Sequence, residues 1–366
     1  MIVIGTDTHK QTHTAGAVFA GTGQLAGELT APARKAGFVE LLHWGRALDR
    51  ERIWAIEDCR HVSGSFERFL VAAGERVIRV PPKLMGESRK GERTRGKSDP
   101  IDALAIARAA LKEGPETLPC AHLDERALEV KLLLDHREDL VKARSEDQQR
   151  LRWHLHDLWP ELEIPVGALD RHLWLDRIAR KLARSEQSAR VRIARELVLA
   201  IRQRTRRAAE LQREIGSLVR TQAPGLVALP GCGALTAAKL LAETAGAERF
   251  SSDAKLARLA GVAPIPASSG KRSRHRLDRG GNRQLNCALH RIAVTQGRVY
   301  PPAREYLSRK QAEGKSRMEA LRCLKRHLAR AVWQALRSAE DRGSNTRSSH
   351  LTDTPNLRPV AGLALT

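Results

Sequence analysis

The 366-residue sequence predicts an α/β domain with a mixed sheet, then a long helical arm, then a mostly α-helical C-terminal domain. Short apolar runs of β type come first and then alternate with helical patterns. Residues 124–220 hold almost no glycine and repeat Leu, Ala, Arg and Glu at helical spacing. Residues 226–246 form a helix-hairpin-helix pattern around a Pro-Gly-Cys-Gly turn. We place the domains at 1–115, 116–222 and 223–342, and a polar, Ser/Thr-rich, disordered tail at 343–366.

The first domain begins with three apolar runs that can close into a meander. We expect strands at 2–6, 14–20, 27–31, 52–56 and 76–80 and helices at 35–48 and 62–73. Three strands followed by alternating helix and strand indicate a mixed sheet covered by helices. Asp7 and Glu57 each follow directly after one of these strands.

Residues 97–103 read Lys-Ser-Asp-Pro-Ile-Asp-Ala and predict the start of a helix that runs to about residue 112. Pro100 suits the first helical position, which makes Asp99 the N-cap and Asp102 the third helical residue. Residues three apart share one face of a helix, so both carboxylates can point at one spot. Capping and the helix dipole alone would also explain the two acids.

Four acids can therefore meet in one place. In an open α/β sheet chemistry gathers at strand ends, so Asp7 and Glu57 are adjacent if the first and fourth strands are neighbours. The helix with Asp99 and Asp102 then needs only to pack across that edge. Four carboxylates repel unless cations neutralise them, and hard oxygen ligands suit Mg²⁺ or Mn²⁺. Two such ions about 4 Å apart stabilise both oxygens of a phosphodiester displacement, so the pattern favours a metal nuclease or transferase. His9 and His13 lie near this pocket, where lone histidines are more often structural.

Charge and composition indicate the partner. The chain has 64 Lys and Arg against 42 Asp and Glu, a net charge of +22, which predicts nucleic acid or an anionic membrane. No apolar run reaches the roughly 18 residues of a spanning helix, and the N-terminus lacks a signal layout, so nucleic acid is favoured. The five scattered cysteines indicate reduced cytosolic thiols rather than zinc ligands or disulfides. Aromatic residues make up only 4%, which argues against base stacking as the main binding mode.

The predicted arm consists of two long helices that break near residues 160–167. They would form an antiparallel hairpin or coiled coil. Its seam would contain Leu133, Leu140, Leu151, Leu155 and Leu158. An ordinary helical spacer and an arm that dimerises or clamps nucleic acid both remain open, and the many exposed arginines favour the second.

The C-terminal domain carries most of the candidate phosphate contacts. The turn with Gly231 and Gly233 exposes N–H groups where a phosphate can sit, although a hairpin that serves packing alone has the same pattern. Further helices are expected at 256–264, 279–296 and 315–338, and the basic, glycine-rich residues 86–98 are interpreted as a mobile loop. The other nucleic-acid-binding candidates are Lys10, Lys97, Lys271, Arg272, Arg274, Arg276, Arg279 and Arg283.

The motifs around the four acids resemble a known pattern. Gly-Thr-Asp7-Thr-His-Lys, Ala-Ile-Glu57-Asp and Lys-Ser-Asp99-Pro-Ile-Asp102-Ala resemble the DEDD motif of transposases with an N-terminal RuvC-like (RNase H-like) domain. The stretches at 229–231, 263–264, 268–270, 279–283 and 320–326 look like the second domain of the same family. That family is the bridge-RNA-guided insertion-sequence recombinases, the "IS one-ten" group, relatives of the Piv and MooV invertases. The resemblance covers roughly residues 1–340 and departs mainly in the polar tail.

The resemblance implies a chemistry. A serine of the second domain attacks a DNA phosphodiester to give a covalent phosphoserine link, while the acids hold Mg²⁺. The family's Pro-x-x-x-x-Ser-Gly spacing fits Pro264 to Ser269-Gly270, so Ser269 is the expected nucleophile and Ser268 the fallback. The acids can activate it only if the second domain docks over the first, in the same or another protomer.

The resemblance also implies partners and a place. A structured non-coding RNA from the element's own end would pair with target and donor DNA. Exchange of two duplexes needs several active sites, so we expect a dimer or tetramer with the arm as interface. The protein would act in the bacterial cytoplasm at the nucleoid, with no membrane partner.

Two other functions fit the residues. A plain metal nuclease of the junction-resolving type would use water as nucleophile and need no guide RNA. A non-catalytic nucleic-acid-binding protein on the same fold would tolerate loss of Asp99 and Asp102, but no part of the acidic motif is missing.

Overall fold

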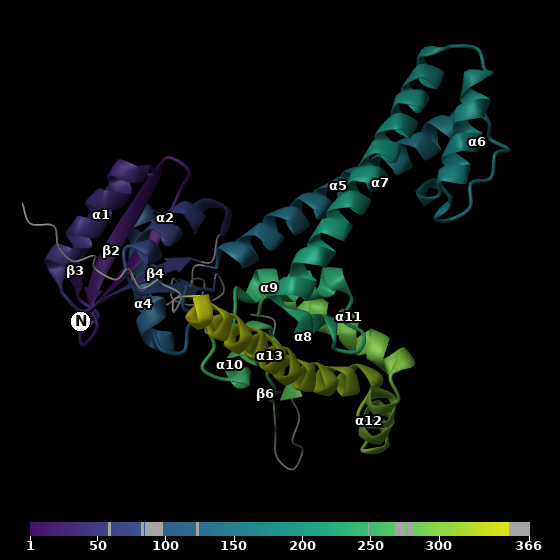
Figure 1. The fold of residues 1–366 in the computed structure, drawn as a ribbon. Coiled ribbons are helices and arrows are strands. Elements are labelled where there is room, and N and C mark those ends of the chain that lie inside the picture. The colour runs from purple at the N-terminus through teal and green to yellow at the C-terminus, as the bar shows by residue number, and fades with distance from the viewer. Residues whose placement is uncertain are drawn as a thin grey trace, which may run out of the picture.

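The computed structural model describes residues 1–57, 60–81, 84, 98–121, 124–247, 249–267, 275–276, 278 and 281–350. A sheet domain lies at one end of the molecule, and a long helical hairpin projects from a cluster of helices beside it (Figure 1). In the part of the chain described, no helix combines the length and apolar character needed to cross a membrane. The four described cysteines, Cys120, Cys232, Cys287 and Cys323, are free thiols.

The N-terminal sheet has five strands in the order β3-β2-β1-β4-β5. Their bounds are β1 Ile2–Thr8, β2 Thr12–Phe19, β3 Leu25–Pro32, β4 Arg52–Glu57 and β5 Val77–Val80. β1 pairs antiparallel with β2, and β2 with β3, whereas β1–β4 and β4–β5 are parallel. The predicted mixed sheet is confirmed, and its central strand β1 is buried along its whole length.

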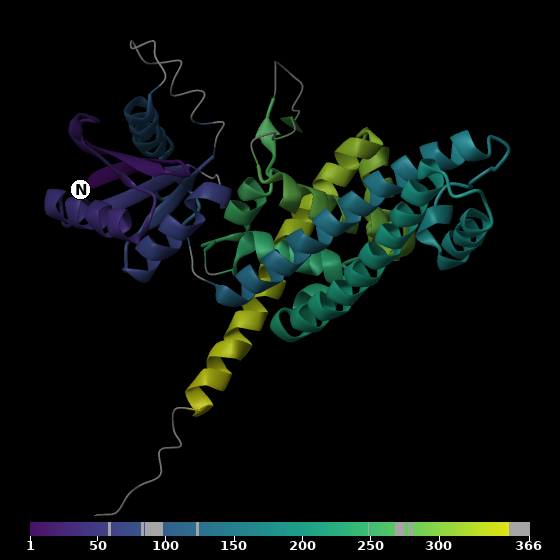
Figure 2. The same cartoon turned by 90° about the horizontal axis from the view of Figure 1, so that it is seen from above.

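Helices cover both faces of this sheet. α1 (Lys35–Leu48) and α2 (Arg60–Ala72) pack on Ile2, Ile4, Trp54 and Ile56, while α4 (Asp99–Glu113) packs on Val3, Ile53 and Ala55. Successive side chains of a strand point to opposite faces, so the apolar runs of β1 and β4 supply both layers. The view from above separates α4 from α1 and α2 on the two faces (Figure 2).

Two local predictions in this domain are wrong. β1 continues through Asp7 to Thr8, because the antiparallel ladder with β2 pairs Asp7 with Thr14 and Thr8 with His13. α4 begins at Asp99, not after it, and its N-cap is Ser98. The Asp102 N–H donates to the Ser98 carbonyl over 3.0 Å, so Asp102 is the fourth helical residue. Asp99 and Asp102 remain three apart and keep a common face.

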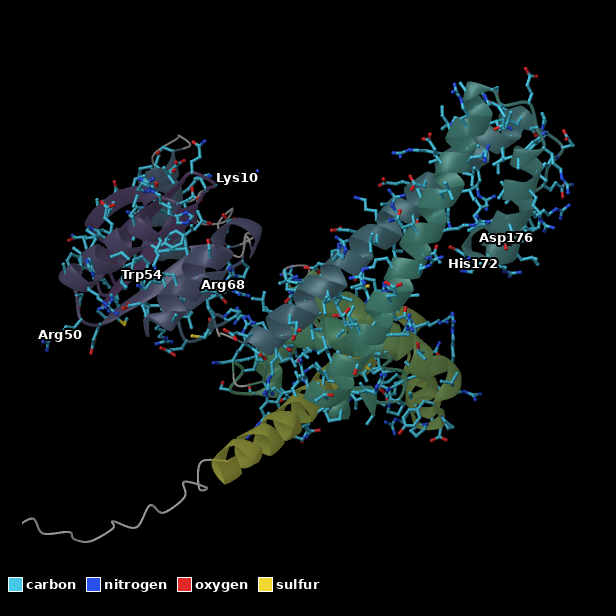
Figure 3. The ribbon with its side chains drawn as sticks, turned by 45° about the horizontal axis from the view of Figure 1, so that its top comes forward. Lys10, Arg50, Trp54, Arg68, His172 and Asp176 are labelled. Atoms are coloured by element: carbon cyan, nitrogen blue, oxygen red, sulfur yellow. The ribbon has the colours of Figure 1, made fainter. Side chains whose placement is uncertain are left out.

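The arm is formed by α5 (Glu125–Leu158) and α7 (Ala189–Gln222), which run back alongside each other (Figure 1). Leu151 and Leu155 of the predicted seam are buried, and Leu133, Leu140 and Leu158 are partly buried against the core. The sequence prediction missed the 3₁₀ turn Ala168–Asp170 and α6 (His172–Ala183) between them. His172 and Asp176 of α6 lie at the far end of the arm, where Asp176 pairs with Arg202 of α7 (Figure 3).

The C-terminal helices share one core with the base of the arm. Val130 and Leu134 of α5 and Leu211 and Ile215 of α7 belong to the same buried cluster as the C-terminal helices. Those elements are α8 Pro224–Val227, α9 Ala234–Thr244, α10 Asp253–Leu259, β6 Ile265–Pro266, β7 His275–Arg276, α11 Arg283–Val299, α12 Pro301–Ala312 and α13 Arg317–His350.

Three features of this region differ from the prediction. α12 was not expected, because Pro301-Pro302 suggests a break although proline suits the first turn of a helix. The helix expected at 256–264 is α10 and ends at Leu259. α13 continues to His350, past residue 343, where the tail is expected to begin. Extending an existing helix needs no new nucleus, which lets weak helix formers follow a strong segment; residues 351–366 lie outside the described part.

Candidate active site

Asp7 and Glu57 lie on neighbouring parallel strands. The ladder pairs Thr6 of β1 with Ile56 of β4, and Glu57 is the last residue of β4. Val3 and Ala55 pack toward α4, so the alternation of strand side chains places Asp7 and Glu57 on that same face. The expected adjacency of the two strands is confirmed.

Gly5 brings α4 close to β1. A Cβ built on Gly5 would lie 2.0 Å from the Ala103 carbonyl oxygen and 2.5 Å from the Ala107 nitrogen. No side chain fits in this space, so helix and strand backbones are in direct contact. The sequence interpretation did not single out Gly5, although a glycine inside a strand often marks such an approach. Its position beside Asp7 sets where the first turn of α4 lies relative to that carboxylate.

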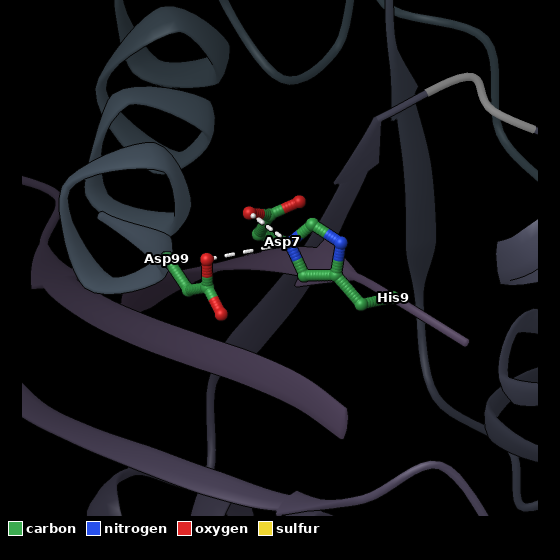
Figure 4. A group of neighbouring side chains, drawn as sticks. All are labelled: Asp7, His9 and Asp99. Carbon is green, nitrogen blue, oxygen red and sulfur yellow. Dashed lines mark hydrogen bonds and ion pairs between the residues drawn. The ribbon is translucent and has the colours of Figure 1, made fainter. Parts of the chain in front are cut away.

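Asp7, His9 and Asp99 form a compact group at this edge (Figure 4). His9 Nε2 lies 3.1 Å from Asp7 Oδ2 and 3.4 Å from Asp99 Oδ1. One ligand atom from each of the three residues falls within 4.8 Å of the others. Asp7 is buried, whereas His9 and Asp99 are exposed, so the group opens to solvent on the α4 side.

Burial raises the pKa of Asp7 above its ordinary value. The contact with His9 lowers this pKa, and the negative charges of Asp102 and Asp99 raise it further. Asp102 is buried on α4. Its charge acts on the Asp7 carboxyl, so the two side chains lie near each other. The folded chain thus holds a carboxylate whose ionised form is disfavoured until more positive charge arrives.

The structure sorts the predicted site residues. It brings Asp7 and Asp99 together, places Asp102 within electrostatic reach, and sets Glu57 on the same face at the end of β4. Glu57 and Asp102 are not members of the compact three-residue group. His9 is not an isolated side chain, because its ring contacts two of the acids. The sequence carries a sign of the contact between His9 and Asp7, because residues two apart in an extended segment lie on the same face.

His13 is the structural histidine of the pair. Its ring is buried and stacks on Phe38 at a centroid distance of 5.4 Å and tilts against Phe66 at 5.2 Å. Position 13 follows the turn after β1, where the side chain enters the layer between the sheet and α1.

The donor set of the group fits a divalent cation. Carboxylate oxygens are the ligands that Mg²⁺ and Mn²⁺ prefer, whereas an imidazole nitrogen is a more usual ligand of zinc, copper, iron and nickel ions. A cation among Asp7, His9 and Asp99 would neutralise the charges that raise the pKa of Asp7. These residues can therefore hold a metal ion.

The predicted serine lies outside the described residues. So do Ser268, Lys97, Lys271, Arg272, Arg274 and Arg279. The structure does describe the two strands on either side of the serine segment: Ile265 pairs with Arg276 and Pro266 with His275. The paired strands β6 and β7 form the base of a short hairpin, and Ser269 lies between them in the sequence.

The described nucleic-acid candidates occupy different settings. Lys10, Arg276 and Arg283 are exposed. Gly231 has a positive φ of 77°, and a Cβ there would lie 3.2 Å from Thr295. Gln296 Nε2 donates to the Pro230 carbonyl over 2.7 Å, so this part of the turn packs on α11, which favours the packing alternative at Gly231. Gly233 is the N-cap of α9 and has open space around it.

Comparison with known proteins defines the class. A family model described as "Transposase" matches residues 4–160, which contain nearly all of the sheet, the acidic group and the whole of α5. A second model, described as "Transposase IS116/IS110/IS902 family", matches residues 224–308, which contain the hairpin. The chain is a transposase and acts on DNA. It belongs to the IS110 family of insertion-element transposases, the IS one-ten group whose motifs it resembles.

Relatives match over most of the chain. An insertion element IS116 protein of Streptomyces clavuligerus is 27% identical over 384 residues, covering 92% of this chain and 94% of the relative. An IS900 protein of Mycobacterium paratuberculosis is 27% identical, covering 78% and 83%. An IS110 protein of Streptomyces coelicolor is 29% identical, covering 72% and 76%. The similarity thus extends across the sheet domain, the arm and the C-terminal helices.

Proposed function

We propose that this transposase is an RNA-guided, Mg²⁺-dependent DNA recombinase that works through a covalent phosphoserine intermediate. The convergence of Asp7, His9 and Asp99 at the contact between β1 and α4 carries the proposal. The mixed five-stranded sheet with helices on both faces supports a RuvC-like domain. The domain limits proposed are 1–115, 116–222 and 223–342.

Ser269 is the proposed nucleophile, with Ser268 as the fallback. Its Oγ bonds to phosphorus and loses its proton, the P–O bond to one sugar oxygen breaks, and that sugar oxygen takes up a proton. A sugar hydroxyl of the exchanged strand then attacks the phosphoserine, restores the phosphodiester and releases the serine hydroxyl. No oxidant or energy donor is needed, because each step replaces one P–O bond by another.

Asp7, Glu57, Asp99 and Asp102 are the proposed ligands of Mg²⁺, or of Mn²⁺. Bound there, a divalent cation would stabilise the charge that builds up on the attacking and leaving oxygens. The four carboxylates would hold the cation in place, and Gly5 lets α4 approach closely enough for Asp99 to lie beside Asp7. A serine hydroxyl is a weak nucleophile, so the hairpin must reach this group in the same or another protomer.

The guide RNA and the oligomer are further parts of the proposal. The net charge of +22 supports a large polyanionic partner, which the structured non-coding RNA together with target and donor DNA would provide. Trp153, Leu173 and Leu199 on the arm are 72%, 74% and 62% exposed, which supports a dimer or tetramer joined through the arm. The protein would work in the cytoplasm at the nucleoid.

The serine is tested by trapping the adduct. Wild type, Ser269→Ala and Ser268→Ala are incubated with labelled target DNA, Mg²⁺ and RNA co-purified from the host, then denatured and resolved by gel. We expect wild type and Ser268→Ala to retain labelled DNA on the protein and Ser269→Ala to lose it. Adducts in both variants would refute the serine assignment. Cleavage without any adduct in wild type would favour a nuclease that uses water.

The RNA is tested by sequencing what co-purifies with the protein. We expect one discrete RNA encoded beside the gene. Cleavage at full rate by protein freed of RNA would contradict guidance.

A further inference from the structure

A second cavity lies away from the acidic group. It has a volume of about 520 Å³ and is bounded by α12, α13, residues 261–264 and β7. Volumes of this size are typical of small-molecule sites. Six of its lining side chains are cationic: Arg276, Lys310, Lys315, Arg322, Lys325 and Arg326. Three are acidic, so positive charge prevails in the cavity.

Lys325 is the most unusual of these side chains. It is 5% exposed, and its Nζ donates to the Asn286 Oδ1 over 2.5 Å. The Asn286 amide nitrogen in turn donates to the carbonyls of Ala260 and Gly261, over 2.8 Å and 3.2 Å, which fixes the orientation of the amide. Lys325 therefore has a neutral partner and no carboxylate within ion-pair distance among the described residues. Burial and the nearby Arg322 lower its pKa.

Other cationic side chains of the cavity, unlike Lys325, form ion pairs with carboxylates. Arg326 pairs with Asp253 over 2.9 Å, and Lys310 pairs with Glu313 over 2.7 Å. A buried charge without an opposite charge is costly, and the cost falls when an anion binds. Arg322 lies 3.7 Å from Glu319, a looser ion pair than the other two. Arg322 and Lys325 are three apart on α13 and share a face, so both can bind one anion.

An aromatic ring lies in the same cavity. Tyr306 of α12 is partly buried, and its ring meets the edge of His327 at a centroid distance of 5.1 Å. The Arg309 guanidinium carbon lies 5.4 Å from the ring centroid. Tyrosine beside cations is the combination that binds a nucleobase next to its phosphate. Few aromatic residues occur in the chain, so a ring in a basic cavity is informative.

We infer that this cavity binds one unpaired nucleotide of a nucleic-acid strand, with its phosphate on Lys325, Arg322 and Arg276 and its base against Tyr306. The choice of a nucleic-acid ligand rests on the proposed function. Arg276 of β7 belongs to both the hairpin and the cavity, so the bound nucleotide would lie beside β7. The cavity would thus hold the nucleic-acid strand next to β7, which follows the proposed serine in the sequence.

The test measures binding apart from chemistry. Full-length protein is titrated with a fluorescent single-stranded pentanucleotide, as DNA and as RNA, in EDTA, and anisotropy is recorded at several salt concentrations. The variants are Lys325→Met, Arg276→Gln and Tyr306→Leu. Arg276 is exposed, so its replacement leaves the fold intact. Arg330→Gln is the control, because Arg330 is exposed on α13, outside the cavity lining, and carries the same charge.

We expect Lys325→Met to weaken binding by about tenfold or more, the loss typical of a charge-assisted contact. Arg276→Gln should weaken binding and lower the salt slope by about 0.7, as for one phosphate contact on a single strand. Tyr306→Leu should weaken binding about fivefold or more, and Arg330→Gln less than twofold. The strand type that loses more affinity, DNA or RNA, is the one that the cavity holds.

Thermal melting separates a binding role from a structural one. Removal of a buried charge without an opposite partner should leave the melting temperature of Lys325→Met unchanged or higher. A lower melting temperature together with unchanged affinity would overturn the inference, and so would unchanged affinity in Arg276→Gln and Tyr306→Leu. None of these measurements depends on Ser269 or on a metal, so their failure leaves the adduct test of the proposed function intact.

Discussion

Two buried carboxylates, Glu75 and Asp7, lie at opposite ends of the parallel strands and have different contacts. Glu75 lies just before β5, where Arg46 donates to it over 3.0 Å, Arg52 over 2.6 Å and the Trp54 indole over 3.1 Å. Asp7 lies near the end of β1, where the His9 ring nitrogen lies 3.1 Å from its carboxylate.

The pKa values of the two carboxyls shift in opposite directions. Burial works to raise the pKa of Glu75, but its hydrogen bonds from Arg52, Arg46 and Trp54 outweigh burial and lower it. Burial raises the pKa of Asp7, and the negative charges of Asp102 and Asp99 add to the rise against His9. Glu75 is neutralised from within the chain, whereas the group around Asp7 offers ligand atoms to a cation. Chemistry is thus expected at the Asp7 end.

The largest expected effect is the difference in DNA cleavage between the variants that neutralise Asp7 and Glu75 one at a time. Asp7→Asn should lower DNA strand cleavage at least about 100-fold, because a metal-site contribution of several kcal/mol is lost. Glu75→Gln should keep the cleavage rate per folded molecule within about twofold, since Glu75 is far from the reacting phosphate. Single-turnover cleavage of labelled DNA measures both. Equal losses in the two variants would contradict the division of roles.

Glu75→Gln, which should leave cleavage nearly unchanged, should lower the free energy of unfolding. Glu75→Gln leaves Arg52 and Arg46 without their carboxylate, which should lower the free energy of unfolding by about 3 kcal/mol. Glu51→Gln is the control, because Glu51 is exposed, and should change it by less than about 0.5 kcal/mol. Urea unfolding followed by circular dichroism gives both values. A change as small in Glu75→Gln as in Glu51→Gln would refute the structural role.

Gly5→Ala should damage the Asp7 end alone. The added Cβ must push α4 from β1, at a cost of about 1–3 kcal/mol, and carries Asp99 away from Asp7. Cleavage should fall more than the unfolded fraction explains. Gly27→Ala in β3 is the control, because a Cβ there would meet Trp44 at an ordinary 3.5 Å. If folded Gly5→Ala cleaved DNA at the wild-type rate, the contact between α4 and β1 would not determine the position of the acidic group.

The smallest expected effect is a pH-dependent difference in melting temperature. Because its folded pKa is raised, Asp7 contributes stability below its ordinary value of 3.8 that is lost as pH rises through the folded pKa. In EDTA, Asp7→Asn should therefore melt above wild type at neutral pH, with the difference fading near pH 4. Glu75 has a lowered pKa, so Glu75→Gln should melt below wild type at neutral pH. Scanning calorimetry from pH 4 to pH 8 checks both signs.

The sequence predicted the backbone of this site but not its closest contacts. Apolar runs and the Asp-Pro pair specify β1, β4 and α4, and the parallel neighbours then bring Asp7 and Glu57 to one face. The contact of His9 with Asp99 could not be predicted, because it depends on the approach of α4, a tertiary contact made possible by Gly5. Asp99 was taken as the N-cap because proline suits the first helical position, yet the helix starts one residue earlier.

The C-terminal region shows the same limit. β6 and β7 have two residues each, too short for a periodic pattern, so the hairpin base could not be predicted. The cavity beside it is assembled from α12, α13 and β7, which are separate in sequence. Lys325 looks like any basic residue of an amphipathic helix until its burial and its neutral partner Asn286 are known.

Titration of the metal-free protein with Mn²⁺, followed by electron paramagnetic resonance, tests the central claim most directly. Wild type and Glu75→Gln should bind the ion with the same affinity at neutral pH, and Asp7→Asn should bind it at least about tenfold more weakly, since each 1.4 kcal/mol of lost contact is a factor of ten. Equal binding by wild type and Asp7→Asn would contradict the claim that the Asp7 end of the sheet takes its missing positive charge from a metal ion.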